Sequence, residues 1–199
     1  MSALVVLAHP RRDSYTAALA HRAVDALGPS SRLLDLYRSG FDPTMDREEH
    51  RRYLDGQPPT DPIAAEHARL LASVEHVVFV YPTWWGTVPA MLKGWLDRVL
   101  APEVAFTLTD RWPHVRPALT NVRAVTGIAT YGSPRWNVRL INDGGRRTLT
   151  RAMRLACGWR TRTRWLALYA LDNSTAADRE AFSMRVEHTL RDVATRVPR

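Results

Sequence analysis

The residue types best suited to bind a ligand occur in three short stretches, each of which follows an apolar run. The first, "HPRRDSYT", covers residues 9–16 and leads into a helical pattern. The amino end of a helix presents unpaired N–H groups and a partial positive charge, so this position predicts a phosphate site. The alternative is that Asp13 or Ser14 only caps the helix. On the phosphate interpretation, side-chain donors would come from His9, Ser14 and Thr16, and charge from Arg11 and Arg12.

The second stretch, "YPTWWGTVPAMLKGWLDRVL", raises the question of why two adjacent tryptophans lie in a turn. Pro82 ends the preceding apolar run and Gly86 permits a tight turn. Between them, Trp84 and Trp85 cannot both point into a core. Aromatic rings beside a turn backbone suit a flat ligand, because the rings stack on it while N–H groups meet its polar edge. Alternatively, one tryptophan covers the sheet edge and the other fills a dimer interface.

The third stretch, "ATYGSPRW", covers residues 129–136 and again follows an apolar run. Its backbone and hydroxyl groups could bind a ligand, and Trp136 adds an aromatic surface. The alternative is an ordinary Gly-Ser-Pro turn. The groups concerned are those of Thr130, Tyr131, Gly132 and Ser133.

These stretches need elements that bring them together, and the chain alternates short apolar runs with longer amphipathic ones. Runs such as "VVFV" are apolar at consecutive positions, which is typical of a parallel sheet covered on both faces. We expect a single α/β domain over residues 1–199, in which ligands bind at the carboxyl ends of the strands. The predicted strands are 3–8, 31–37, 76–82, part of 121–132, and 162–171. The predicted helices are 14–27, 66–74, 88–100, about 140–156, and 175–197, with Ser174 or Thr175 capping the last.

Composition narrows the function classes. The net charge is +8, but the basic residues are spread along the chain, so we expect attraction of an anionic ligand and no nucleic-acid partner. Cys157 is the single cysteine, so the chain forms no internal disulfide, and we expect a packed core thiol. Lys93 and Arg98 are expected to be exposed. No cluster has metal-ligand spacing, and no apolar run is long enough to span a membrane, so we expect a cytoplasmic protein. Neither G-x-G-x-x-G nor a P-loop pattern occurs.

Residues from about 3 to 135 resemble the flavodoxin-like NAD(P)H:quinone oxidoreductases. This group includes mammalian quinone reductase, bacterial modulators of drug activity and the ancillary subunits of potassium-efflux systems. The motifs that carry the resemblance are "LVVLAHPRRDSYTAAL", "DLYRSGFDPTMDREE" and "YPTWWGTVPAMLKGWLDRVL". The last is highly specific, because family members have a very similar P-x-x-W-aromatic-x-x-P-A-x-L-K-G-W-x-D-R-V run.

The resemblance implies a flavodoxin-like three-layer sandwich with a five-stranded parallel sheet and a bound flavin. The flavin phosphate would be held by His9, Ser14, Tyr15 and Thr16. The isoalloxazine would be contacted by Pro82, Thr83, Trp84, Trp85 and Gly86. Its pyrimidine side would be closed over by Thr130, Tyr131, Gly132 and Ser133. The acceptor would meet Trp85 and Trp136.

The activity implied by the resemblance is transfer of hydride from NAD(P)H, through the flavin, to a quinone or similar flat acceptor in a ping-pong cycle. FMN is the expected cofactor and FAD the alternative, because the chain lacks the long C-terminal extension of the FAD-dependent mammalian enzymes. Members of this type are homodimers with the active site between subunits, and "GFDPTMDREEHRRYLDG" would lie on the dimer side. The alternative function is a flavin- or nucleotide-binding regulatory subunit of a membrane transport system.

The chain departs from the family at three places. Thr16 stands where Asn is frequent, and residues 130–133 stand where Thr-Thr-Gly-Gly is frequent. Trp136 lies near the position of a catalytic Tyr of the mammalian enzyme, and no His follows it in the next stretch. We therefore assign no catalytic side chain, and protons for the reduced product would come from solvent or another group.

Overall fold

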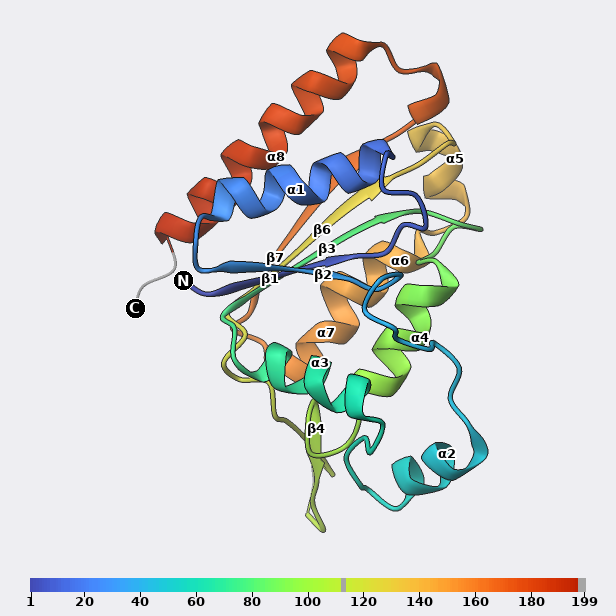
Figure 1. The fold of residues 1–199 in the computed structure, drawn as a ribbon, viewed down its shortest axis with the longest axis vertical. Coiled ribbons are helices and arrows are strands. Elements are labelled where there is room, and N and C mark those ends of the chain that lie inside the picture. Colours follow the sequence, from blue (N-terminus) through green and yellow to red (C-terminus); the bar gives the residue numbers. More distant parts are fainter. Residues whose placement is uncertain (112–113, 197–199) are drawn as a thin grey trace.

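A computed structural model describes residues 1–111 and 114–196, and its centre is a five-stranded sheet. The strands run parallel in the order β2-β1-β3-β6-β7 (Figure 1). The order reverses direction around β1 and β3, which is the switch point where ligands bind in such sheets. The predicted α/β architecture is therefore confirmed. The strands are β1 (Ala3–Leu7), β2 (Ser31–Asp35), β3 (His76–Pro82), β6 (Ala124–Thr130) and β7 (Arg162–Leu168).

Helices cover both faces of this sheet (Figure 1). On one face, α1 (Tyr15–Leu27) lies beside α8 (Ala176–Arg196). The opposite face is covered by α3 (Pro62–Ala72), α4 (Ala90–Val99) and a broken helical segment. That segment consists of α5 (Arg135–Leu140), α6 (Gly144–Arg147), the π-helical turn η1 (Thr148–Ala152) and α7 (Met153–Cys157). The remaining elements are α2 (Arg47–Leu54), β4 (Phe106–Leu108), β5 (Val115–Pro117) and η2 (Leu171–Asn173).

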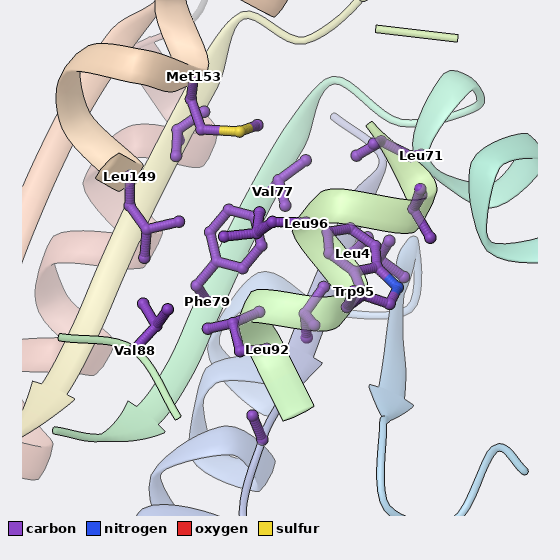
Figure 2. Packing of buried hydrophobic residues seen from close by; sticks show 14 of the residues in the cluster. Leu4, Leu71, Val77, Phe79, Val88, Leu92, Trp95, Leu96, Leu149 and Met153 are labelled. Atoms are coloured by element: carbon purple, nitrogen blue, oxygen red, sulfur yellow. The ribbon is translucent and has the colours of Figure 1, made fainter. Parts of the chain in front are cut away.

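The core on the α4 face explains the periodic apolar stripe after the tryptophan turn. Leu92, Trp95 and Leu96 of α4 point toward Phe79 of β3 (Figure 2). The rings of Trp95 and Phe79 meet edge to face, with centroids 5.9 Å apart. Cys157 is buried in the same core, as predicted, and burial raises the pKa of its thiol to about 12. This packing fixes the start of α4, and with it the turn that precedes the helix.

The structure corrects several predicted boundaries. The predicted helix over 140–156 is broken near its start, because Asn142 and Asp143 have positive φ angles of 66° and 35°. The predicted strand 162–171 ends at 168, and Ala170 turns the chain with φ 52°. Thr175 caps α8 as predicted, accepting from the Asp178 amide at 3.1 Å. The predicted end of that helix at Val197 lies outside the described residues.

The segment 41–61 is docked on α4, and this docking corrects one prediction. Arg98 is buried, and its guanidinium meets the Glu49 carboxylate at 2.7 Å and the Asp42 carbonyl. Lys93 is exposed as predicted and pairs with Asp97 along the helix. A Cβ atom at Gly94 would lie 2.2 Å from the Pro43 carbonyl oxygen, so only glycine admits the crossing chain. As a charged residue, Arg98 was predicted to be exposed. It is buried because the segment 41–61, which is distant in sequence, covers it.

Candidate functional site

The three ligand-binding stretches meet at one edge of the sheet, as predicted. Their strands β1, β3 and β6 are adjacent and parallel, so their carboxyl ends lie side by side. The Thr83 amide donates to the Thr130 carbonyl at 2.8 Å, which joins the second and third loops. The Thr16 and Thr130 hydroxyls are buried 3.2 Å apart, which joins the first and third. The three loops are therefore joined to one another by hydrogen bonds along this edge of the sheet.

The first loop leads into the start of α1, where a phosphate site is predicted. The Ser14 hydroxyl accepts from the Ala17 amide at 3.1 Å, so Ser14 is the cap of α1. The cap leaves the amides of Tyr15 and Thr16 without an intrahelical partner. The Arg11 amide donates to His9 Nδ1 at 3.1 Å, which holds the imidazole over the loop. Burial lowers the pKa of His9, so its imidazole is neutral at pH 7.

Two side chains of this loop differ from the prediction. The Tyr15 hydroxyl donates to the Arg179 carbonyl of α8 at 2.6 Å, so its ring points away from the loop. Tyr15 can therefore offer a phosphate only its backbone amide. Arg11 pairs with Asp13 at 2.9 Å, and both side chains are exposed. Its charge is thus already matched within the loop, which leaves Arg12 as the loop's unmatched arginine among the described residues.

The second loop is a tight turn whose two central residues are Trp85 and Gly86. Trp84 and Thr87 exchange amide–carbonyl hydrogen bonds of 3.1 and 3.0 Å. Trp85 has φ 48° and Gly86 has φ 71°, the pattern of a type I′ turn. A positive φ is unfavourable for a bulky residue and occurs mainly where the site requires it. Trp84 is 63% and Trp85 100% exposed, so neither ring lies in the core.

Residues at the break between α5 and α6 contact this turn and stabilise it. The Gly144 amide donates to the Gly86 carbonyl at 2.9 Å. A Cβ atom at Gly86 would lie 2.6 Å from Cδ1 of Ile141, the flexible end of that side chain, so glycine is favoured here mainly by the positive φ. The carbonyl of residue 86 is thereby occupied. The amides of Trp85 and Gly86 have no hydrogen-bond partner among the described residues.

The third loop presents its backbone, while its tyrosine is part of the core. The Tyr131 hydroxyl donates to the Asp143 carboxylate, 3.0 Å from each oxygen, and its ring stacks on Tyr169 at 4.8 Å. Burial, followed by the Asp143 charge, raises the pKa of Tyr131. The Tyr131 backbone is occupied too, because its amide donates to the Leu168 carbonyl and its carbonyl accepts from the Leu171 amide, both at 2.9 Å. The prediction that this residue faces a ligand therefore holds for neither its ring nor its backbone. Trp136, on α5, is 70% exposed and is the exposed ring nearest this loop in sequence.

Sequence reasoning missed Asp143, which positions two of the three loops. Its carboxylate accepts from Tyr131, and the next residue, Gly144, holds the tryptophan turn. The tetrapeptide "NDGG" was a usable signal, because Asn, Asp and Gly favour turns and positive φ. The apolar periodicity over 140–156 instead favoured one continuous helix.

The arrangement suits binding of a phosphate and a flat polar ring. Helix-start amides are available for the phosphate, and exposed indoles with turn amides are available for the ring. Thr83 Oγ1 is buried at the base of the tryptophan turn, close to the Tyr131 hydroxyl. These features fit a flavin.

Two searches of the described residues complete this description. Within residues 1–111 and 114–196, no three His, Cys, Asp or Glu side chains are arranged to hold a metal ion. Over the same residues, no helix has the length and apolar character needed to cross a membrane.

Comparison with known proteins assigns the family. A family model described as a flavodoxin-like fold matches residues 1–192. The chain belongs to this flavodoxin-like family. The resemblance seen in the three sequence motifs is thus confirmed, and the match extends beyond residue 135, the expected end of the resemblance.

Curated relatives of this family member carry oxidoreductase names. NAD(P)H dehydrogenase (quinone) 1 of Rattus norvegicus is 32% identical over 151 residues, which are 66% of this chain and 54% of the relative. An uncharacterized NAD(P)H oxidoreductase of Escherichia coli, YcaK, is 37% identical over 105 residues, which are 51% of this chain and 54% of the relative. The chain therefore spans about half the length of the curated relatives it matches.

Solved structures agree in fold. An NAD(P)H:quinone oxidoreductase from Methanothermobacter marburgensis superposes with a TM-score of 0.83 at 21% identity, over 97% of this chain and 98% of that one. An FMN-dependent NADH-azoreductase from Bacillus anthracis, in complex with FMN, superposes with a TM-score of 0.77 at 16% identity, over 98% of this chain and 100% of that one. At these identities the likeness concerns the fold alone.

Proposed function

We propose that this protein is a flavin-dependent NAD(P)H oxidoreductase that reduces a quinone or a similar flat acceptor. The observation that carries the proposal is the meeting of a helix start, an exposed tryptophan turn and a third backbone loop at adjacent strand ends. The names of the relatives from rat and Escherichia coli support the same chemistry.

Each loop has a distinct role in this proposal. The amides of Tyr15 and Thr16, with the Ser14 and Thr16 hydroxyls and His9, bind the flavin phosphate. Residues 82–86, which include Trp84, Trp85 and Gly86 of the tryptophan turn, lie along the flavin ring. Gly132 and Ser133 approach the ring from the other side with backbone groups. The protein thus supplies orientation, stacking and fixed dipoles.

The bound flavin supplies hydride transfer, accepting from NAD(P)H and passing reducing equivalents to the acceptor. Donor and acceptor use one open face beside Trp85 and Trp136, which supports a ping-pong order. We assign no catalytic side chain, so protons for the product come from solvent or another group. FMN is the proposed cofactor, in keeping with the FMN-bound azoreductase of the same fold, and FAD is the alternative.

We also propose a cytoplasmic homodimer with the site at the subunit interface. Large apolar side chains gather around the site and are exposed in the single chain, as expected for a surface that a partner covers. They are Trp84, Trp85, Trp136, Leu140 and Ile141. Light scattering on the purified protein should give twice the 22.6 kDa chain mass.

The visible absorption spectrum tests the function most directly. The purified protein is reconstituted with FMN or FAD, freed of excess cofactor and titrated anaerobically with NADPH and NADH. We expect a bound flavin band that bleaches with a nicotinamide and returns when a quinone is added. A bound flavin that neither nicotinamide reduces would instead favour the regulatory-subunit function. Absence of flavin binding would contradict the site itself.

A further inference from the structure

An arginine-lined cavity lies beside the candidate site and takes no part in the roles described above. Its volume is about 260 Å³. It is formed where α5, the Asn142–Asp143 break, α6 and the end of β7 come together. Its lining residues are Arg135, Val138, Arg139, Asp143, Arg146 and Tyr169.

The cavity shares its walls with the flavin site. Asp143 accepts from the Tyr131 hydroxyl of the third loop, and Tyr131 stacks on Tyr169. Arg135 follows that loop two residues after Ser133. The neighbouring break also holds the tryptophan turn, through Gly144 and Gly86. A molecule stacked on the turn can therefore extend a substituent into the cavity.

The charge of the lining is strongly positive. Three guanidiniums, of Arg135, Arg139 and Arg146, face a single carboxylate, and that carboxylate already accepts from Tyr131. In the described part of the chain none of the three guanidiniums forms an ion pair, unlike Arg11 and Arg98. Clustered like charges repel each other, so the cluster is stabilised when an anion enters.

We propose that this cavity binds an oxoanionic group of a molecule that occupies the flavin site. Guanidinium forks bind phosphate, carboxylate and sulfonate oxygens through paired hydrogen bonds. The volume is below the usual range for a whole ligand, so it fits one charged substituent and part of its scaffold. Two sources carry such a group: the 2′-phosphate of NADPH, or an acidic substituent of the acceptor. The proposal rests on the proposed oxidoreductase function for its substrates.

Kinetics with matched charged and uncharged substrates test the proposal and separate the two sources. The variants are Arg135→Gln and Arg139→Gln, and the control is Arg147→Gln, an exposed residue on the same broken helix outside the lining. The donor pair is NADPH against NADH, and the acceptor pair is 1,4-naphthoquinone-2-sulfonate against 1,4-naphthoquinone. We expect kcat/KM for one charged member to fall about tenfold, the effect of one charge-assisted hydrogen bond, with its uncharged counterpart little changed.

Selective loss with NADPH identifies the donor phosphate, and selective loss with the sulfonated quinone identifies the acceptor. Equal ratios in wild type and both lining variants would overturn the proposal, as would an equal change in Arg147→Gln. A calorimetric titration with inorganic pyrophosphate separates this question from turnover. Binding that is weakened in Arg139→Gln and kept in Arg147→Gln supports the anion site even if flavin reduction fails. No pyrophosphate binding to the wild-type protein, together with equal kinetic ratios, rejects it.

Discussion

At the scale of single residues, Trp85 combines two unfavourable properties, a fully exposed indole and a positive φ. Neither property stabilises the free chain, because the ring buries no surface and the backbone conformation costs about 1 kcal/mol or more. The neighbouring Gly144–Gly86 hydrogen bond and Ile141 packing impose the turn from outside. We therefore propose that ligand binding favours tryptophan at this position, while the surrounding contacts hold the unfavourable backbone conformation.

Replacing Trp85 with Gly should separate these two properties from each other. We expect an unchanged or slightly higher free energy of unfolding, by up to about 1 kcal/mol, because glycine accepts positive φ. Flavin affinity or quinone turnover should fall, because the stacking surface is lost. Denaturant titration and flavin fluorescence measure the two quantities. Trp159→Gly, at another exposed tryptophan, should leave flavin affinity intact; the same loss there would exclude a specific role for Trp85.

Replacing Tyr131 with Phe should remove the donor to Asp143 while keeping the stacked ring. We expect a loss of about 1–2 kcal/mol in the free energy of unfolding, the usual effect of losing a hydrogen bond to a charged group. Weaker flavin binding should accompany it, because Asp143 then no longer ties the third loop to the break beneath the turn. Tyr37→Phe, on the surface, is the matched control and should change neither quantity. Equal stability of Tyr131→Phe and wild type would contradict the positioning role.

The sequence predicted which residues lie at this edge of the sheet better than it predicted the directions of their side chains. Trp84, Trp85 and Gly86 form the exposed turn that their types predicted. The rings of Tyr15 and Tyr131 instead turn into the protein, toward Arg179 and Asp143. At the end of a strand a side chain may take either face, and the distant elements α8 and α6 decide which one. No local pattern contains that information.

At the scale of elements, α4 carries two ion pairs in opposite environments. Lys93 and Asp97 pair on the exposed side of the helix, whereas Arg98 pairs with Glu49 beneath the segment 41–61. Arg98 also lies 5.3 Å from the Phe41 ring centroid. Exposed pairs contribute little, but removing one member of a buried pair leaves an uncompensated charge. The buried Arg98–Glu49 pair is therefore expected to stabilise the fold, whereas the exposed Lys93–Asp97 pair is expected to contribute little.

Replacing Arg98 with Gln should reduce the free energy of unfolding by about 3–5 kcal/mol and release segment 41–61. Lys93→Gln, five residues before Arg98 on the same helix, should cost less than about 1 kcal/mol. Denaturant titration measures both, and limited proteolysis reports cleavage between residues 42 and 61. Equal losses in the two variants would show that the burial of the Arg98 pair does not matter.

At the scale of the whole molecule, the alternation of apolar and amphipathic runs predicted the sheet, its helical layers and the edge where the three loops meet. Strands β1 and β6 are buried at every position, and such strands are largely apolar, which is a local signal. The β4–β5 hairpin, α2 and the broken helix after β6 were missed. Their positions depend on contacts such as Glu49 with Arg98 and Gly144 with Gly86, which join residues far apart in sequence.

The stability of the whole fold should depend on pH through His76, at the start of β3. His76 is fully buried, its Nε2 lies 2.9 Å from the Thr126 hydroxyl, and burial lowers its pKa to about 4. The unfolded chain, with a His pKa near 6.5, binds this proton more readily. The stabilisation is therefore complete above about pH 6.5 and is lost as pH falls toward 4, by about 3 kcal/mol.

Denaturant titrations between pH 7.5 and 4 measure this loss. His76→Gln should show a shallower decline over the same window, whereas His21→Gln, on the surface of α1, should retain the wild-type slope. Burial also lowers the pKa of His67, so part of the decline should persist in His76→Gln. Identical slopes in wild type and His76→Gln would contradict the assignment.

The outer border of β7 has a consequence for how copies of the chain associate. β7 is the last strand of the sheet, and Arg162 and Arg164 are exposed on it at alternate positions. Charged side chains along a free strand oppose its pairing with another strand. Two copies should therefore meet through loop and helix surfaces and not by extending one sheet into the next. The same arginines should oppose aggregation through pairing of β7 strands at high protein concentration.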